Sequence, residues 1–563
     1  MSAVRSGRLG AERGALTAAA VAGLFSAALA AAASRPWGLG PLGLCCYVPA
    51  FVVILRSRRP LSGAVTAGLA SLGVVSVGYE ATVGIFPGVY ALALVVASLP
   101  FAAAGALAVR FLNSSFVSRL TVAYRPAVSM FALACLWALA ELLPASADLF
   151  GVWALPLSVI GYSQIDLPTA QLAAFSSVTA VSAFVLLINA SLAASWIVLA
   201  AVSTGSTVQR RAPRLRRELL AVVLTVVLTV LAPAIGLTAL LTAPLAVGAP
   251  GPDEGGFTPK AGSALNIRLV QPNLPDSVYV AAGVLPSVRE WLVADLVAVA
   301  AAGPTAASTS TTLTLLPEAA WPSVIEPSEA AALYNAVHDL GPMLIGAATN
   351  GWTDPDLDGP DGATIAAGHA GSTGSAADGL TNRPRTANSV LGSDAGGITH
   401  LYDKRRLVPI AESRLQPGAG PVVVAIAGLK VAPLICYDVV FAADARAAAR
   451  AGAELLAVHT DDSFAARADV PRLHLRVARM RAIETGLPVA LVSNTGPSAV
   501  IAADGNLIAT TSPLEATTLT AALPGGSGTT PYVRFGDWVG GAITAIGLGV
   551  GALSVAGGGA PRA

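Results

Sequence analysis

The sequence VAPLICYDVVF, residues Val431–Phe441, decides how the rest of this chain is interpreted. Its apolar first half predicts a buried strand, and that strand ends abruptly at Cys436, Tyr437 and Asp438. A thiol at a strand end, followed by backbone N–H groups that turn away, is where a nucleophile can meet a carbonyl. Taken alone, a cysteine of this kind is more commonly a small buried hydrophobic residue. The remaining sequence must therefore decide between these two interpretations.

The composition indicates a protein that faces lipid over much of its surface. The chain has 563 residues, too many for one ordinary core, so we expect more than one domain. Hydrophobic residues make up 54% and charged residues only 12%, whereas soluble proteins have about 25% charged residues. The net charge of +1 gives no electrostatic reason to bind nucleic acid. The 4 cysteines and 5 histidines lack the spacing of a disulfide framework or metal site.

Long apolar runs predict a polytopic membrane region, because a helix of about 20 residues crosses a bilayer. Seven candidate spans precede residue 250 and an eighth ends the chain: 16–34, 40–55, 62–84, 87–110, 122–143, 172–201, 218–246 and 535–557. The first span follows several arginines and resembles a signal peptide, but further spans follow at once, so we expect it to be retained. We therefore predict a membrane domain at 1–246 and a C-terminal transmembrane helix and tail at 527–563.

Arginines predict the orientation of these spans. If eight spans alternate, four groups of arginines fall on one side of the membrane: residues 5, 8 and 13; residues 56, 58 and 59; residues 110 and 119; and residues 210, 211, 214, 216 and 217. Basic loops stay in the cytoplasm, so the region 247–534 is expected to face outward. Glu141, near the outer end of the fifth span, has either a partner or function at that depth or a carboxylate that reaches water.

The region after the membrane domain changes to a soluble pattern. A linker at 247–262 is rich in glycine, proline and acid, and 263–526 alternates between short apolar runs and helical patterns. Strands are expected at 265–270, 311–316, 343–348, 422–426, 431–436, 455–458 and 489–492, and helices at 288–302, 328–340 and 472–485. This pattern predicts a largely buried sheet layered with helices. The tract 351–383, with almost no large apolar residue, predicts an exposed loop that is either a lid or an insertion.

Three polar residues of this domain are candidate partners for Cys436. Glu318 directly follows an apolar run, and Lys404 and Glu412 lie close together further along the chain. Lysine occurs only at positions 260, 404 and 430, whereas arginine is plentiful. A lysine at 404 therefore suggests that a compact ammonium is needed there; the alternative is an ordinary surface cation.

These residues could form a coherent catalytic set. A free thiol has a pKa of about 8.5 and needs a base or a positive neighbour to become a good nucleophile. Glu318 could take the proton, while Lys404 could stabilise both a thiolate and a tetrahedral oxyanion. The backbone N–H of Tyr437 could be a second oxyanion donor. The product would be a thioester that an amine or water could attack.

Three segments resemble the motifs of the nitrilase superfamily. They are Pro317-Glu318…Trp321-Pro322, Tyr402-Asp403-Lys404…Leu407-Val408-Pro409…Glu412, and Ile435-Cys436-Tyr437. More narrowly, the chain resembles the membrane-bound apolipoprotein N-acyltransferases of bacteria. Further matches are Val270–Asn273, Asn388-Ser389, Ala478–Glu484, Trp137–Glu141 and Gly161–Gln164.

The resemblance implies a polytopic α-helical bundle of about eight spans that carries an extracytoplasmic nitrilase-like domain, an αββα sandwich. It also implies a two-step acyltransferase. Cys436 would take an acyl chain from a membrane phospholipid as a thioester, and the α-amino group of the S-diacylglyceryl cysteine of an apolipoprotein would then attack it. Glu318 would be the general base and Lys404 the oxyanion stabiliser.

Other expectations follow from the same resemblance. Glu412 matches a second family glutamate near the site, Tyr437 matches the residue after the nucleophile, and Asp438 stands two residues after it. The expected location is the cytoplasmic membrane of a bacterium, with the catalytic domain on the outer face. We expect a monomer without metal or diffusible cofactor, and with phospholipid and diacylglyceryl-apolipoprotein as its partners.

The chain departs from the family pattern at several positions. Asp438 replaces the usual glutamate, and Pro144 stands where an arginine often follows the fifth span. The loops at 410–416 and 460–464 also differ, and the second lacks the family's tryptophan. Two alternatives therefore remain open: a membrane-tethered amidase that uses water, and a catalytically idle relative that binds lipoproteins or a partner enzyme.

Overall fold

The computed structural model describes most of the chain. Four long ranges are described, 2–203, 265–301, 311–352 and 386–556, apart from short gaps at 81–82, 84–86, 122–123, 152–153, 276, 279–280, 283–284, 322–323, 464–468, 524 and 527. The chain divides into two units. Met1–Ala249 with Asp537–Ala563 contains the predicted spans and is called the membrane unit, and Pro250–Gly536 contains the predicted catalytic residues and is called the catalytic unit. The second unit extends past the predicted end at 526, because α18 (Pro531–Phe535) packs on α16 (Ala442–Arg450).

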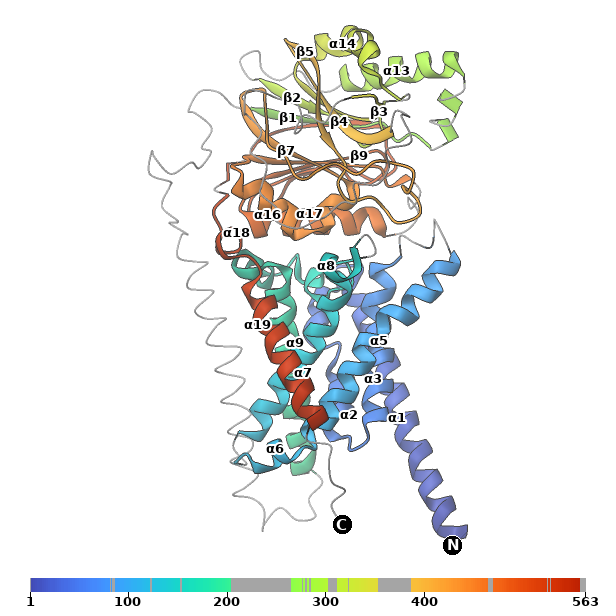
Figure 1. Cartoon of the computed structure of the whole chain (residues 1–563), viewed down its shortest axis with the longest axis vertical. Coiled ribbons are helices and arrows are strands. Elements are labelled where there is room, and N and C mark those ends of the chain that lie inside the picture. The colour runs from blue at the N-terminus through green and yellow to red at the C-terminus, as the bar shows by residue number, and fades with distance from the viewer. Residues whose placement is uncertain are drawn as a thin grey trace, which may run out of the picture. The chain divides into compact units, whose positions relative to one another are not determined.

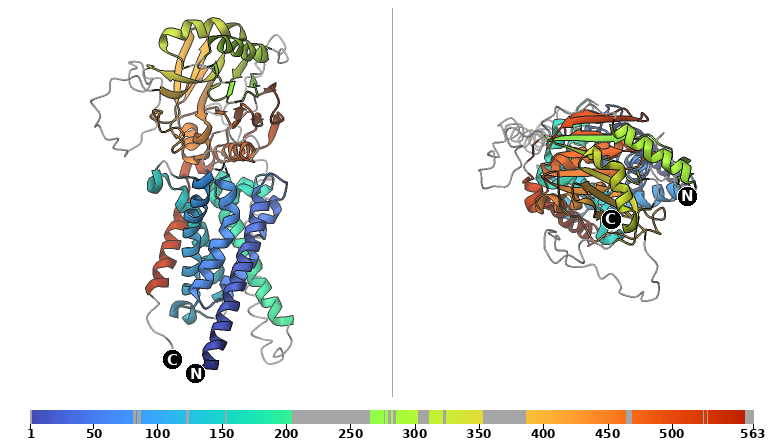
Figure 2. Two further views of the ribbon diagram at one scale, coloured as in Figure 1. Left: turned by 90° about the vertical axis from the view of Figure 1, so that its right-hand side faces the viewer. Right: turned by 90° about the horizontal axis from the view of Figure 1, so that it is seen from above.

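The membrane unit is a bundle of apolar helices (Figures 1 and 2). Its main helices are α1 (Ser2–Ser34), α2 (Val48–Arg56), α3 (Pro60–Gly78), α5 (Pro87–Leu112), α7 (Arg125–Ala145), α9 (Ala173–Ser203) and α19 (Trp538–Ala556). Within the described ranges, six helices are long and apolar enough to cross a membrane, namely all of these except α2. The predicted helical membrane region is therefore confirmed.

The predicted count of eight spans stays a prediction. The candidate at 40–55 contains a 3-10 turn (Gly40–Leu44) followed by α2, which has 9 residues. An α-helix of that length is shorter than the hydrocarbon core of a bilayer. The candidate at 218–246 lies outside the described residues, as does nearly all of the predicted loop at 351–383.

Small residues allow the membrane helices to approach closely. A Cβ added to Gly105 in α5 would collide with the carbonyl oxygen of Gly63 in α3, and one added to Gly73 would collide with the carbonyl oxygen of Ala27 in α1. Such close backbone approach is typical of helix packing in membranes, where dispersion contacts replace the hydrophobic effect. Shape complementarity therefore holds this unit together.

Aromatic side chains fill the interior of the bundle around Trp137. The centroid of its ring system lies 4.6 Å from the ring of Tyr47, 5.1 Å from Phe51 and 5.5 Å from Phe101. One helical turn after Trp137, Glu141 is buried with an exposed fraction of 3%. The interpretation of Glu141 as a carboxylate that reaches water is therefore wrong.

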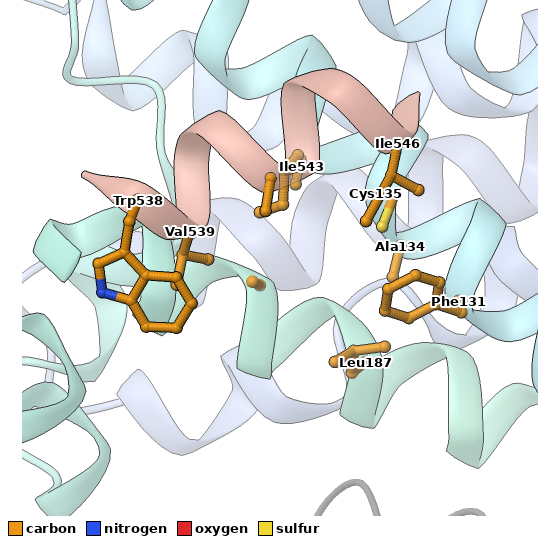
Figure 3. Close-up of a pocket in the computed structure, with 11 residues that line it drawn as sticks. Phe131, Ala134, Cys135, Leu187, Trp538, Val539, Ile543 and Ile546 are labelled. Carbon is orange, nitrogen blue, oxygen red and sulfur yellow. The ribbon is translucent and has the colours of Figure 1, made fainter. Parts of the chain in front are cut away.

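The start of α19 is hydrogen-bonded to α9, and an apolar cavity lies further along α19. Asp537, directly before α19, accepts hydrogen bonds from Ser176 Oγ (2.9 Å) and Thr179 Oγ1 (2.7 Å) near the start of α9. Further along, α7, α9 and α19 surround a cavity of about 180 Å³ (Figure 3). Its lining is apolar throughout and includes Phe131, Leu187 and Ile543.

The catalytic unit contains two six-stranded sheets. The first has the order β12-β1-β2-β3-β4-β5 and the second β11-β10-β9-β8-β7-β6. The first consists of β1 (Asn266–Gln271), β2 (Thr312–Leu315), β3 (Met343–Asn350), β4 (Thr386–Asp394), β5 (Gly397–Asp403) and β12 (Thr517–Ala522). The second consists of β6 (Val424–Ile426), β7 (Leu429–Ile435), β8 (Leu455–Thr460), β9 (Val489–Ser493), β10 (Ala499–Ile501) and β11 (Leu507–Thr510).

The sequence alternation explains why the two sheets form the middle layers. Leu344 packs against the second sheet, while its neighbours Met343 and Ile345 pack under the helices α13 (Pro286–Ala301) and α14 (Ala330–Val337). Successive strand residues point to opposite faces, so both faces of this strand are buried. In the second sheet, β9 contacts α17 (Val470–Thr485), and α17 contacts α16. The predicted αββα sandwich is confirmed (Figure 1).

Candidate active site

Three strands of the two sheets bring the predicted catalytic residues together. Glu318 lies shortly after β2, Lys404 directly after β5, and Cys436 directly after β7. Within the first sheet, β2 is parallel to β3, while β4 is antiparallel to both β3 and β5. β2 and β5 therefore run in the same direction, and their carboxyl ends meet at one edge of the sheet. The two side chains consequently reach each other across 86 residues of sequence.

Lys404 is the centre of a buried charge network. Its Nζ lies 2.8 Å from Oε1 of Glu318 and 2.8 Å from Oε1 of Glu412. Burial alone would lower the pKa of this ammonium, but the charges of Glu318, Cys436 and Glu412 raise its pKa well above the usual value. A buried cation beside two carboxylates remains protonated. The interpretation of Lys404 as a surface cation is wrong, because its side chain is 1% exposed.

Both carboxylate oxygens of Glu318 accept hydrogen bonds. Oε1 accepts hydrogen bonds from Lys404 Nζ and from Asn388 Nδ2, each at 2.8 Å. Oε2 accepts the backbone N–H of Asp461 at 3.0 Å. The segment that carries Glu318 can pack against β3 only because residue 346 is glycine. A Cβ at Gly346 would collide with the carbonyl oxygen of Pro317. Glu318 is therefore fixed in one orientation.

Cys436 occupies an unusual backbone conformation at the end of β7. Its φ of 46° lies in the left-handed region, which a residue with a side chain rarely adopts outside functional sites. The residue is 6% exposed. Burial and the nearby charge of Glu318 raise the pKa of the thiol well above its usual value, although Lys404 lowers it. The resting thiol is therefore protonated and must transfer a proton when it reacts.

Asp438 connects the turn that carries Cys436 to the segment that carries Lys404. Its Oδ2 accepts the backbone N–H of Ile435 (3.0 Å) and the hydroxyl of Tyr402 (2.8 Å), and its Oδ1 accepts the N–H of Arg406 (2.7 Å). Burial raises the pKa of Asp438 to about 7. These contacts make Asp438 a clamp between β5 and β7.

The other two predicted residues occupy different positions. Glu412 belongs to the charge network, and its Oε2 accepts the N–H of Val408 at 2.6 Å, which fixes the loop after Lys404. The ring of Tyr437 packs edge-on against Phe441, with centroids 5.2 Å apart. The predicted role of the Tyr437 N–H as an oxyanion donor stays a prediction.

Several contributors were absent from the predicted set. Asn388 in β4 also donates to Glu412 Oε1 at 3.3 Å. The available signal was the match of Asn388-Ser389 to the family pattern, since none of the predicted strand ranges covers β4. Nδ1 of His459 lies 2.6 Å from the carbonyl oxygen of Leu316, and burial lowers the pKa of His459 to about 4. No sequence pattern indicated that the backbone N–H of Asp461 would contact Glu318. Within the described ranges, no three His, Cys, Asp or Glu residues gather where they could hold a metal ion.

Comparison with known proteins gives the class of this fold and site. Residues 268–532 match the family model described as "Carbon-nitrogen hydrolase". Residues 26–191 match the "Apolipoprotein N-acyltransferase N-terminal domain". The catalytic unit thus matches a carbon-nitrogen hydrolase domain, and the membrane unit matches the N-terminal domain of apolipoprotein N-acyltransferases. Over both units, the chain is therefore similar to the bacterial apolipoprotein N-acyltransferases.

Individual relatives match shorter segments. The apolipoprotein N-acyltransferase of Shewanella oneidensis is 34% identical over 110 residues, which is 20% of this chain and 21% of that protein. The one from Bordetella bronchiseptica is 32% identical over 194 residues, or 28% of this chain and 35% of that protein. The chain thus spans only about a fifth to a third of the curated relatives that it matches. A solved amidase of Nesterenkonia sp. AN1 is 22% identical with a TM-score of 0.32, covering 48% of this chain and 93% of that one.

Proposed function

We propose that this protein transfers a fatty acyl chain from a membrane phospholipid to the N-terminal amine of a diacylglyceryl-apolipoprotein. The observation that carries the proposal is the Glu318–Lys404 ion pair beside Cys436, in a chain whose described residues include six helices long and apolar enough to cross a membrane. A soluble hydrolase would need the site but would have no use for the helices. A lipid acyl donor and a lipid-anchored acceptor explain both.

In the first step, Glu318 accepts the thiol proton while the sulfur of Cys436 attacks the ester carbonyl of the phospholipid. The ammonium of Lys404 and the N–H of Tyr437 stabilise the tetrahedral oxyanion. Collapse breaks the ester C–O bond, Glu318 returns the proton to the departing alkoxide, and a lysophospholipid leaves. An acyl-thioester remains on Cys436.

In the second step, the α-amino group of the lipoprotein cysteine attacks the thioester carbonyl. Glu318 accepts a proton from the amine, the C–S bond breaks, and the proton passes to the departing thiolate of Cys436. The products are an amide and the resting thiol. The same two oxyanion donors serve both steps, because the carbonyl carbon stays attached to Cys436 between them.

The proposed orientation places the catalytic unit on the outer face of a bacterial cytoplasmic membrane. The basic loops after α2 and α5 lie at one end of the bundle, since Asn113 Nδ2 donates to the carbonyl oxygen of Ser57 at 3.1 Å. Loops rich in basic residues stay on the cytoplasmic side of the membrane. The chain enters α19 beside the start of α9, at the opposite end of the bundle, where Asp537 bonds Ser176. This path supports an outward catalytic unit.

The decisive experiment is detection of an acyl group on Cys436. The full-length protein is incubated with phospholipid vesicles and digested, and the peptide containing Cys436 is analysed by mass spectrometry. We expect an acyl-thioester that disappears on addition of a diacylated lipopeptide, together with an N-acylated lipopeptide product. Cys436→Ala should stay folded in the membrane and form neither species.

Two other outcomes would contradict the proposal. Acyl release at the same rate with and without lipopeptide would indicate a hydrolase that uses water. A thiol that never becomes acylated in the presence of phospholipid would indicate an idle relative.

A further inference from the structure

A buried ion pair lies beside this site, and the mechanism above does not use it. Nδ1 of His474, in the first turns of α17, lies 2.8 Å from Oδ1 of Asp462, in the turn after β8. The two side chains are 8% and 1% exposed. Buried charges are costly unless they are paired, and removal of one partner leaves the other uncompensated. The pair therefore constrains the turn strongly.

That turn touches the catalytic base. The backbone N–H of Asp461, next to Asp462, donates to Oε2 of Glu318 at 3.0 Å. On its other side, the Asp461 carboxylate accepts a hydrogen bond from Asn494 Nδ2 at 3.1 Å, just after β9. Asn494 thus holds one side of the turn, and the contact of Asp462 with His474 holds the other. Displacement of the turn would free one oxygen of the base.

The pair also affects the charge balance around the thiol. Burial and Glu318 raise the pKa of Cys436 most, and the negative charge of Asp462 adds to this effect. Burial alone would lower the pKa of His474, but Asp462 and Glu318 raise it, whereas Lys404 lowers it. An imidazolium at His474 therefore balances the charge of Asp462. Without it, an uncompensated carboxylate would oppose formation of the thiolate.

We propose that Asp462 and His474 are a positioning pair for the nucleophile and its base. They hold the turn that orients Glu318, and the imidazolium cancels the negative charge of Asp462 next to Cys436. This role rests on the proposed function of Cys436 as the nucleophile. It can nevertheless be measured without lipid substrate, because alkylation by iodoacetamide also requires the thiolate.

The test compares two variants of the full-length protein in detergent. His474→Asn keeps an N–H donor near the position of Nδ1 but removes the positive charge. The double variant Asp462→Asn/His474→Asn removes both charges and keeps a donor and an acceptor. Alkylation of the peptide containing Cys436 is followed by mass spectrometry across a pH series on both sides of neutrality.

We expect His474→Asn to slow alkylation about tenfold near neutral pH, with the rate profile moved about one unit to higher pH. The double variant should return to within about twofold of the unchanged protein, as a double-mutant cycle shows for coupled charges. The pH profile also contains the titration of other groups near the thiol and its base. These are Glu318, Lys404 and Glu412, together with Asp461, whose pKa burial raises to about 6, and all of them are the same in every variant.

The matched control is Arg472→Gln, which breaks an ion pair to Asp469 near the start of α17. Its atoms are 3.8 Å apart and Arg472 is 53% exposed, so no change is expected. An unchanged rate in His474→Asn, or equal slowing in the single and double variants, would overturn the proposal, since both mean that charge balance is not involved. If these variants behave as expected but no acyl-thioester forms from phospholipid, only the proposed function fails.

Discussion

The two units of this protein use different physical means to hold their buried groups. In the catalytic unit, buried charges are fixed by directional contacts from distant strands, as Lys404 is by Glu318 and Glu412. In the membrane unit, helices are placed by shape, as where Gly63 and Gly105 allow two backbones to touch. Hydrogen bonds fix the direction of a group, whereas close packing fixes only the separation of helices.

This difference predicts which substitutions each unit tolerates. A change of charge without a change of shape should damage the catalytic unit most, because it leaves a buried partner unsatisfied. A change of volume without a change of charge should damage the membrane unit most where two helix backbones touch, as α3 and α5 do, because an added side chain has no space there. The following substitutions test this division.

Lys404→Met should have the largest effect. The methionine keeps most of the length of the side chain but leaves the carboxylates of Glu318 and Glu412 facing each other without a cation. Loss of one partner of a buried pair costs about 3–5 kcal/mol, and the acylation rate should fall about 1000-fold with the loss of the oxyanion cation. The rate of thioester formation and the thermal midpoint are measured together.

Lys430→Met is the matched control, because Lys430 is exposed on β7. It should change neither quantity. A Lys404→Met protein that acylates within about tenfold of the unchanged rate would mean that this ammonium does not stabilise the oxyanion.

Asp438→Asn should have the next largest effect. The amide keeps the shape of the carboxyl group but places an N–H against one of three donors, the N–H of Ile435, the hydroxyl of Tyr402 or the N–H of Arg406. The resulting shift of Cys436 should lower the acylation rate about 100-fold. Asp394→Asn, at the exposed end of β4, is the control. Equal acylation rates in the two variants would contradict the proposed role of Asp438 in positioning Cys436.

Gly105→Leu tests the membrane unit. The added side chain would force α3 and α5 apart, at a cost of about 1–3 kcal/mol in the free energy of unfolding. The thermal midpoint in detergent should fall, while the alkylation rate of Cys436 in the folded fraction stays unchanged. Gly549→Leu on α19 is the control, since a Cβ there meets nothing within 4 Å. An equal loss of stability in both variants would contradict packing by shape.

His459→Asn should have the smallest effect, and only in acid. Burial lowers the pKa of His459 to about 4 from an ordinary value of 6.5. Below pH 6.5, this histidine is protonated in the unfolded chain but stays neutral in the folded protein. The free energy of unfolding therefore decreases progressively as the pH falls from 6.5 towards 4. Between about pH 6.5 and pH 5 this loss is about 2 kcal/mol.

Asparagine keeps a donor for the carbonyl oxygen of Leu316 but does not titrate. The stability of the His459→Asn protein should therefore fall less steeply between these pH values, as measured by thermal unfolding. His338→Asn is the control, because the side chain of His338 is 44% exposed. If the pH dependence of stability is the same in His459→Asn as in the unchanged protein, the protonation of His459 does not cause the loss of stability in acid.

Much of the architecture follows from local sequence. The long apolar runs predicted helices because crossing a bilayer depends on length and composition alone. The strands preceding Glu318 and Cys436 were predicted from short apolar runs, which depend only on neighbouring residues. The strand preceding Lys404, β5, was not among those predicted runs. The 40–55 run shows the limit, because the apolar composition did not reveal that Gly40–Leu44 forms a separate 3-10 turn.

Local sequence patterns were enough to predict the helical membrane region, the layered α/β domain and three residues with matching chemistry. The contacts that hold those residues in place became visible only in the folded chain. Asn388, the N–H of Asp461 and the contact between Asp462 and His474 all reach the site from separate strands and turns. Their positions depend on the order of strands in two sheets. That order arises from contacts between residues far apart in the chain, so no local pattern reports it.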